Sequence, residues 1–517
     1  MSDKIKSKLD KIDDIKLIGE AILVGLFAGL IVILYRYLLH KVEDLLPILR
    51  NILLENKLYI VIFFILIIAM SIIVGLLRNW EKFSGGSGIP QVEAEIKGYI
   101  NQNPIKILLA KILGGLGCAF GGLSLGREGP SIQIGAMSGK LVSKILSRNK
   151  TTERFLLSCG ASAGLAAAFN APVAGVMFAI EEIHKHVSKK LLITTLTATV
   201  IADYTAKLFY GKDTIFSLNI NNIHIPFNKY WWIALLGIIL SIIAVIYTNL
   251  MKLFNNMYDK LALPIYFRPI IPFILGAILL FICPQVIGGG NYLIDFIIKQ
   301  KPTLFVLLLF FIVKLIFSML SFTSGVAGGI FFPILVLGAS LGSIFGKVLA
   351  PDMIDLFIIL SMAGLLTAIV RAPLTAIILI FEMTGNLTYL LPLSLVCLIA
   401  YAFTNYISLV PIYEYLLENL LKKNEIIKQN TSKKILINAV VQPGSFIDNK
   451  KISEIKWPSN CLIVSIDRGV DEVLPKGSTK LRSGDNLEIL LNENEFINDY
   501  DLITRLCLTE KELLDDI

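Results

Sequence analysis

The sequence predicts an all-helical membrane protein that crosses the bilayer many times in two related halves, followed by a small α+β domain. Of its 517 residues, 55% are hydrophobic and 17% are charged, with a mean hydropathy of +0.71. Soluble domains average roughly 45–50% apolar and 25% charged residues, so this composition indicates a multi-pass membrane protein. The internal repeat and the composition of the last hundred or so residues, described below, predict the rest of the architecture.

Apolar stretches of two kinds make up the membrane part. Eight approach or reach the roughly 20 residues needed to span a bilayer: 17–39, 58–77, 105–123, 191–210, 230–250, 264–282, 303–321 and 387–409. Six shorter ones are interrupted by Gly, Pro or charge, as is typical of broken helices that meet near the middle of the membrane: 130–146, 155–169, 171–183, 330–349, 354–370 and 373–383.

The distribution of lysines predicts that both termini are cytosolic. The first sixteen residues hold five lysines, and the apolar run after them is too long for a signal-peptide core. Four more lysines follow the last span, at 422, 423, 433 and 434, so the number of crossings should be even. We therefore interpret the net charge of +8 as a topology signal and expect no nucleic-acid polymer as a partner.

The apolar region repeats itself at a nearly constant offset. Four residues of the first copy, Lys111, Gly122, Gly126 and Pro130, recur in the second copy as Lys314, Gly325, Gly329 and Pro333. Ala171-Pro172 with Glu181 likewise recurs as Ala372-Pro373 with Glu382. The repeat predicts two halves, about 17–210 and 230–415, that are inverted if each makes an odd number of crossings, with their broken helices meeting at one central site.

The turn Gly126-Arg127-Glu128-Gly129-Pro130 is the first candidate for that site. An ionisable side chain at bilayer depth is costly, and non-helical backbone is tolerated there only where protein encloses it or it lines a cavity. A helix beginning near Pro130 would point unpaired N–H groups and its positive dipole end at the turn, which favours an anion. The carboxylate of Glu128 and a dissolved anion would then compete for the same donors.

Further neutral donors lie in three other places. The turn before Pro90 carries the Ser87 hydroxyl, although the same pattern is typical of a flexible surface loop. The turn at 329–333 is the repeat counterpart of the Glu128 turn, and Tyr413 offers a phenol, unless it is an interface anchor. Partial charges hold a permeating ion firmly enough to replace water and weakly enough to release it, so this set predicts a transported anion.

The composition becomes polar near residue 422. We expect a linker at 421–434, a cytosolic α+β domain at 435–500 with strands at 435–441, 461–466 and 486–491, and a tail at 501–517. Six scattered cysteines show no CxxC spacing, and no HExxH or nucleophile-elbow motif is present. The sequence therefore predicts a protein that is not an enzyme, with no metal, disulfide or cofactor.

Three motifs in order resemble the anion-site motifs of the CLC chloride channels and chloride/proton exchangers: GSGIP at 86–90, GREGP at 126–130 and GGIFFP at 328–333. The resemblance covers about 17–420. It implies the inverted-repeat CLC fold in a homodimer, each protomer with its own ion pathway, as a multi-pass protein of the bacterial cell membrane.

The same resemblance implies roles for particular residues. Ser87 and Tyr413 would be the side-chain donors to a central chloride, with Tyr415 less favoured than Tyr413. The backbone amides of Ile330 and Phe331 would hold the same ion, and Glu128 would be the gating glutamate. The turns that shape the site would include Gly88, Arg127, Gly129 and Gly329. Arg127 would orient its turn rather than contact the ion.

Glu182 resembles the inner proton-transfer glutamate of the family, with an interfacial carboxylate paired with Lys185 or Lys189 as the structural alternative. An acid at this position accompanies proton-coupled exchange in the family, which implies a chloride/proton antiporter. The alternative function is a passive chloride-selective channel of the same fold.

The C-terminal segment departs from the paired CBS domains of many CLC proteins. The phrases CLIVSIDRG and LPKGSTKLRSGDNLEIL resemble the C-terminal module of RCK/TrkA regulators of potassium transport. This resemblance implies a small regulatory ligand at 435–500, a cyclic dinucleotide or another nucleotide. The alternative is a passive module for dimerisation or stability.

Overall fold

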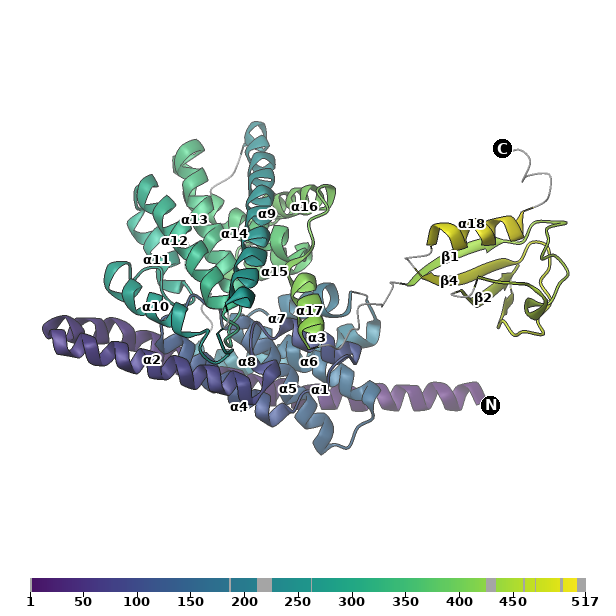
Figure 1. Ribbon diagram of the computed structural model, residues 1–517, viewed down its shortest axis with the longest axis horizontal. Helices are drawn as coiled ribbons and strands as arrows, with labels where there is room; N and C mark the ends of the chain where they lie inside the picture. Colours follow the sequence, from purple (N-terminus) through teal and green to yellow (C-terminus); the bar gives the residue numbers. More distant parts are fainter. Residues whose placement is uncertain are drawn as a thin grey trace. The chain divides into compact units, whose positions relative to one another are not determined.

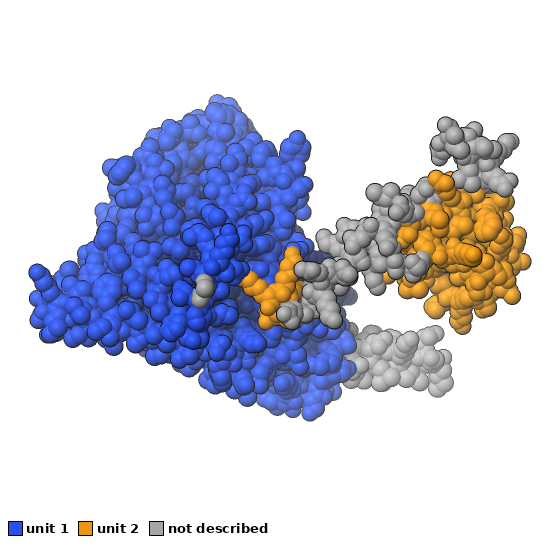
Figure 2. Space-filling view, in the orientation of Figure 1, with its two compact units in different colours: residues 1–420 blue, residues 421–517 orange. Residues whose placement is uncertain are grey.

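The computed structural model describes residues 2–185, 187–211, 226–261, 263–424, 434–458, 461–469, 471–492 and 496–508. These residues form two compact units, 1–420 and 421–517, which are coloured separately in Figure 2. The first unit is helical, and the second contains a sheet.

In the first half of the membrane unit, the described residues form eight α-helices. Several start where the sequence supplies a cap or an N-terminal proline: the side chains of Asn103, Asn149 and Ser188 accept hydrogen bonds from backbone N–H groups of the following first turns. The helices are α1 (Ser2–Glu55), α2 (Lys57–Trp80), α3 (Ile89–Lys97), α4 (Pro104–Phe120), α5 (Glu128–Ile145), α6 (Lys150–Phe169), α7 (Pro172–Phe178) and α8 (Lys189–Tyr210). Between α7 and α8 lies a π-helical turn, η2 (Ala179–His184).

The second half repeats this order. In Figure 1 the helices of the first half, purple to blue, and those of the second half, teal to green, form two neighbouring groups. The second group consists of α9 (Trp231–Lys260), α10 (Ile270–Ile282), α11 (Asn291–Gln300), α12 (Leu304–Thr323), α13 (Phe331–Leu349), α14 (Ile354–Val370), α15 (Pro373–Thr384) and α16 (Leu390–Tyr406), and α17 (Ile412–Lys423) follows it.

Among the described residues, seven helical segments are long and apolar enough to cross a membrane: Ile15–Glu55, Lys57–Trp80, Lys189–Tyr210, Phe227–Lys260, Leu304–Thr323, Phe331–Leu349 and Pro351–Val370. Shorter apolar helices lie between them. The protein is therefore an integral multi-pass membrane protein, as the composition predicts.

The helix lengths differ from the sequence expectation in several segments. The segments 330–349 and 354–370, expected to be short and broken, form helices of 19 and 17 residues. Pro333 does not interrupt α13 because it lies in the first turn, where its missing N–H group has no intrahelical partner to lose. Conversely, 264–282 supplies a helix of only 13 residues, α10, because the chain forms turns before Ile270.

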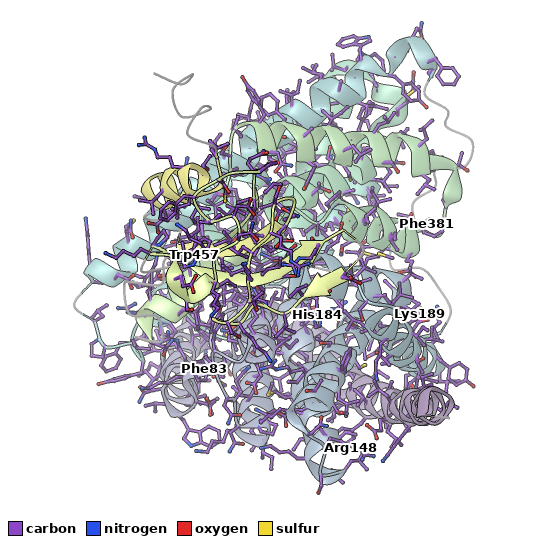
Figure 3. The ribbon with its side chains drawn as sticks, turned by 90° about the vertical axis from the view of Figure 1, so that its right-hand side faces the viewer. Phe83, Arg148, His184, Lys189, Phe381 and Trp457 are labelled. Carbon is purple, nitrogen blue, oxygen red and sulfur yellow. The ribbon has the colours of Figure 1, made fainter. Side chains whose placement is uncertain are left out.

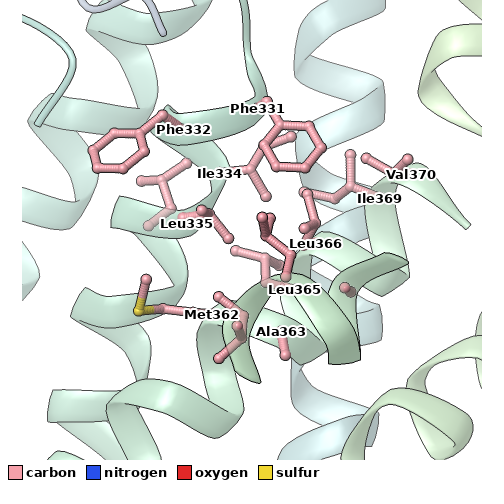
Figure 4. Packing of buried hydrophobic residues seen from close by; sticks show 14 of the residues in the cluster. Phe331, Phe332, Ile334, Leu335, Met362, Ala363, Leu365, Leu366, Ile369 and Val370 are labelled. Carbon is pink, nitrogen blue, oxygen red and sulfur yellow. The ribbon is translucent and has the colours of Figure 1, made fainter. Parts of the chain in front are cut away.

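Glycines allow the repeated helix pairs to pack closely. A methyl group on Gly139 of α5 would lie 2.0 Å from the carbonyl oxygen of Leu156 in α6, and one on Gly342 of α13 would lie 2.2 Å from that of Phe357 in α14. The two glycines occupy equivalent positions of the repeat, so both halves use the same contact. The apolar core centres on α13 and α14, where Phe331, Leu335 and Leu366 are fully or almost fully buried (Figure 4).

The second unit has a four-stranded antiparallel sheet in the order β1-β4-β2-β3. Its strands are β1 (Lys434–Val440), β2 (Leu462–Arg468), β3 (Asp471–Val473) and β4 (Asn486–Asn492), and α18 (Phe496–Cys507) follows them. The three strands expected from the sequence are present, and β3 is an additional one.

The unit continues beyond the expected end at residue 500. Helix α18 runs to Cys507, and its residues Ile503 and Cys507 are buried in the core of the unit. The helix therefore belongs to the domain rather than to a tail. At the other end, α17 extends to Lys423, into the expected linker. The remainder of that linker, 425–433, and the segment 509–517 lie outside the described residues.

Candidate anion and proton site

The three glycine-rich turns of the sequence meet at one place. Gly126 and Gly329 each donate a backbone hydrogen bond to the other's carbonyl oxygen, at 2.7 and 2.8 Å. The N–H group of Gly86 donates to Val326 at 2.8 Å, and its carbonyl oxygen accepts from Gly328 at 3.2 Å. Backbone pairing therefore joins the first-half turns to the second-half turn.

Ser87 lies at this junction. Its side chain is buried, and a methyl group on Gly129 would lie 2.4 Å from its Oγ. Gly88 adopts a left-handed conformation (φ 99°) as the N-cap of α3, which an L side chain rarely adopts. Both glycines are thus required for the hydroxyl to face the start of α5.

Two buried lysines donate hydrogen bonds to backbone carbonyl oxygens in and next to the glycine turns. Lys111 Nζ donates to the carbonyl oxygens of Ser84 and Gly86 at 2.9 and 2.7 Å. Its repeat counterpart Lys314 donates to those of Val286 and Gly288 at 2.9 and 2.8 Å. The repeat thus also contains a second glycine turn, Gly288-Gly289-Gly290, which the sequence analysis missed although its three consecutive glycines were a usable signal.

Glu128 begins α5 with a buried side chain. A methyl group on Gly126 would lie 2.3 Å from Glu128 Oε2 and 3.1 Å from both Phe332 Cβ and Pro333 Cδ. The carboxylate is therefore folded back toward the start of α13, and its Oε2 has no hydrogen-bond partner within the described chain.

The start of α13 supplies the second-half donors. Ile330 is its N-cap and Phe331 its first residue, and both are buried. The first N–H groups of a helix lack intrahelical acceptors and lie at its positive dipole end. The Phe169 ring packs beside those of Phe331 and Phe332, with centroids 5.7 and 6.4 Å away, and closes this end of the site with apolar surface.

The structure separates the two candidate tyrosines. Tyr413 is fully buried, and its phenol lies beside the Ser87 hydroxyl within electrostatic reach of Glu128 and Glu182. Within the described residues, neither hydroxyl group has a partner in hydrogen-bonding geometry. Tyr415 is only partly buried, and its hydroxyl group already accepts a hydrogen bond from Asn255 at 3.3 Å.

Arg127 lies beside the turn rather than within the group of neutral donors. Its Nε is 3.9 Å from Glu128 Oε1, and its side chain lines the same cavity as Glu128. This geometry is consistent with the expected orienting role.

Glu182 lies in the π-helical turn η2 and is buried. Lys185 pairs with Glu414 at 3.9 Å rather than with Glu182. A hydrogen bond of 2.7 Å between the Ser158 hydroxyl and His184 Nε2 attaches the turn to α6. Figure 3 labels His184 and also Phe83, which precedes the Gly85–Gly88 turn.

The neighbouring carboxylates have a role that the sequence analysis missed. Glu181 accepts hydrogen bonds from the first turn of α15, and Glu382, its counterpart in the repeat, accepts them from Val173 and Ala174 in the first turn of α7. Each half thus supplies a carboxylate cap to the other half. The shared Glu in the repeat signalled importance, but its partner became visible only in three dimensions.

Comparisons with known proteins agree with this architecture. A family model described as "Voltage gated chloride channel" matches residues 69–405, and one described as "TrkA-C domain" matches residues 436–497. The H(+)/Cl(-) exchange transporter ClcA of Salmonella arizonae is 34% identical over 368 residues, which cover 68% of this chain and 76% of that protein. The ClcA protein of Salmonella paratyphi B is 34% identical over 367 residues, with the same coverage.

Solved structures give the same result. The crystal structure of a slow cyanobacterial Cl-/H+ antiporter matches with a TM-score of 0.74 and 28% identity, over 79% of this chain and 99% of that one. A CLC-type fluoride/proton antiporter shares the fold, with a TM-score of 0.64 at 20% identity over 77% of this chain and 96% of that one. Because the family model covers more than half of the chain and curated relatives are 34% identical over two thirds of it, the protein belongs to the voltage-gated chloride channel family and carries a TrkA-C domain.

Proposed function

We propose that the protein exchanges chloride for protons across the membrane, with Glu128 as the gating glutamate. The observation that carries the proposal is the position of the Glu128 carboxylate, buried between the starts of α5 and α13 with one oxygen unpartnered. The exchange activity named for the 34%-identical relatives supports the same function.

The ionised carboxylate and chloride compete for the same positive region. When Glu128 is ionised, its carboxylate stays at the helix starts and excludes the anion. When it is protonated, that attraction is lost, and chloride binds to the amides of Ile330 and Phe331 and to the hydroxyl groups of Ser87 and Tyr413. The alternation of one proton and one anion at this place couples the two movements.

Glu182 supplies the proton from the other side. Glu182 is buried and lies near Tyr413, so its carboxyl group is close to one side-chain donor of the proposed anion site. Two carboxylates on separate routes allow the proton and the anion to use different paths.

Reconstitution into liposomes tests this function. We expect an imposed proton gradient to drive chloride against its own gradient, and a chloride gradient to move protons in the opposite direction. Chloride flux that ignores the proton gradient would instead identify the alternative, a passive chloride channel.

We propose that the protein acts as a homodimer through the face formed by α7, α8, α15 and α16. These helices pack against one another and expose large apolar side chains, including Val173, Val200, Leu374, Leu391 and Leu398. A mass measurement on the purified protein in nanodiscs tests the proposal, since one copy per disc contradicts it.

For the TrkA-C domain we propose a regulatory nucleotide ligand, a cyclic dinucleotide or another nucleotide. Calorimetric titration of the full-length protein with a nucleotide panel tests this, and the absence of heat with every member would favour a passive dimerisation or stability module.

A further inference from the structure

A second acidic residue, Glu43 of α1, faces the cavity that contains Glu128. One side of this cavity is formed by Tyr35, Leu39 and Glu43. The Glu128 turn, the second glycine turn and the start of α11 line the same cavity. Two carboxylates from distant parts of the sequence therefore share one cavity.

The Glu43 carboxylate lies over the second glycine turn. A methyl group on Gly288 would lie 3.8 Å from Glu43 Oε1, and one on Gly289 would lie 3.9 Å from it. The turn precedes α11, whose N-cap is Gly290, so the positive end of that helix is close by. Glu43 is half-buried, which leaves it in contact with both the cavity and the solvent.

The charged and titratable groups around Glu43 come from four elements. Lys314 of α12 lies on the far side of the glycine turn, where its Nζ is held by two carbonyl oxygens. Arg127 and Glu128 line the cavity from the first-half turn, together with Cys118 of α4 and Tyr35 of α1. Among these groups, Glu128 and Glu43 are the two carboxylates.

Glu43 and Glu182 lie toward opposite ends of the helical unit. Lys16, Arg148 and Lys190 line one cleft. Glu182 comes shortly before Lys190 in the chain, next to the lysine-rich segment 185–190. Along the continuous helix α1, Glu43 is about 40 Å from Lys16, at 1.5 Å per residue. Glu128 lies between these ends, because the 18 residues of α5, about 27 Å in length, separate it from the face of Arg148.

We propose that Glu43 is the outer proton-transfer residue of the exchanger, opposite Glu182. The inference rests on the proposed exchange function. The proton leaves the Glu128 carboxyl group for water in the cavity, Glu43 accepts it, and Glu43 then releases it to the bulk solution. Only O–H bonds form and break, and the proton is conserved at each step. A carboxylate within one cavity of the donor serves this transfer better than distant solvent.

The test compares Glu43→Gln with wild type in liposomes, in two backgrounds. In the otherwise native protein we expect coupled exchange to fall by about tenfold, since a positioned proton acceptor contributes at least that much. In the Glu128→Gln background, where we expect chloride to move without protons, Glu43→Gln should leave the chloride flux unchanged. Unchanged flux in that background also shows that the variant folds.

Asp44 provides the matched control. It is the next residue along the chain, is exposed, and accepts a hydrogen bond from His40 Nδ1 at 2.9 Å outside the cavity. Asp44→Asn removes the same charge and should leave coupled exchange at the wild-type rate. Glu43→Asp, which keeps the acid, should retain most of the coupled exchange.

Two outcomes would overturn the inference. Coupled exchange at the wild-type rate in Glu43→Gln would show that the proton does not use this residue. Faster chloride flux for Glu43→Gln in the Glu128→Gln background would show that the residue acts on the anion through its charge. If the wild-type protein moved chloride without protons, the proposed exchange function would be wrong. That result is distinct from the two outcomes that would overturn the role of Glu43.

Discussion

The backbone N–H group and the hydroxyl group of Thr375 both donate to the same carboxylate oxygen of Glu181, at 2.7 Å each. The other oxygen of Glu181 accepts from the N–H group of Leu374 at 3.0 Å. In the second half, Glu382 caps α7 in the same way, with bonds of 3.0 and 2.8 Å. The two carboxylates exchange partners between the halves and join them next to the turn that carries Glu182.

Replacing Glu181 with Ala should destabilise the protein without changing the chemistry of transport. The substitution leaves the first-turn donors of α15 without their charged acceptor, and a lost helix cap costs about 1 kcal/mol, with hydrogen bonds to charged groups costing about 1.5–3 kcal/mol. We expect a lower midpoint of thermal unfolding in detergent. An unchanged midpoint would contradict the structural role, and Glu182→Gln serves as the neighbouring control that should leave it unaltered.

Glu128→Gln should abolish proton coupling while chloride flux continues. The amide has the shape of the protonated carboxyl group but cannot release a proton, so it no longer competes with the anion as a charge. Simultaneous recording of chloride and proton movement in liposomes measures the effect. Continued proton pumping in this variant would show that the proton uses another residue.

Glu182→Gln should impair proton movement selectively. The substitution removes the buried inner acid but leaves Ser87, Tyr413 and the start of α13 in place, so chloride should still pass. Glu181→Gln is the matched control, because this residue caps α15 and should retain coupling in the folded fraction. Wild-type coupling in Glu182→Gln would show that the inner acid lies elsewhere.

Tyr413→Phe should weaken chloride binding, because it removes the unpartnered phenol that faces Ser87. A hydrogen bond to a charged group contributes about 1.5–3 kcal/mol, so we expect the dissociation constant to rise between about tenfold and 150-fold. Isothermal titration of the purified protein with chloride measures it. Tyr415→Phe, whose hydroxyl group bonds Asn255, should bind chloride like wild type.

The C-terminal unit should lose stability in acid through Asp485. Burial of Asp485 opposes its ionisation, but hydrogen bonds from the Arg468 side chain and the Arg482 N–H group outweigh this effect and hold the pKa of Asp485 below its usual value. The stabilisation is fully present above the unfolded pKa of about 3.9 and is lost as the pH falls through the lower folded value.

Fluorescence of Trp457 can follow this unfolding after the other three tryptophans are replaced by Phe. Trp457 is labelled in Figure 3 and belongs to the C-terminal unit. The Asp485→Asn variant should be less stable at neutral pH, and its stability should change less on acidification. The control Asp471→Asn, at an exposed position, should behave like wild type. Identical acid transitions for Asp485→Asn and wild type would contradict this account.

The sequence placed most elements because local rules govern them. The prolines and caps marked the starts of several helices, and apolar length marked most membrane spans. The rules failed for α13, where Gly and Pro were expected to interrupt the segment. In the structure Pro333 lies in the first turn, and Gly338 and Gly342 pack against α14. They failed for α18 because only the sheet that it covers shows that residues beyond 500 belong to the domain.

By itself, the sequence determined that the chain is a multi-pass membrane protein with two related halves, and it supplied the glycine turns, the neutral donors and the acids. These properties reside in composition, spacing and repetition along the chain. Only the tertiary structure decided which groups meet: that Gly126 pairs with Gly329, that Tyr413 rather than Tyr415 faces Ser87, that Glu181 caps α15, and that Glu43 shares a cavity with Glu128. The reason is that the site joins residues from both halves, and contacts between residues so distant in sequence depend on how the helices cross.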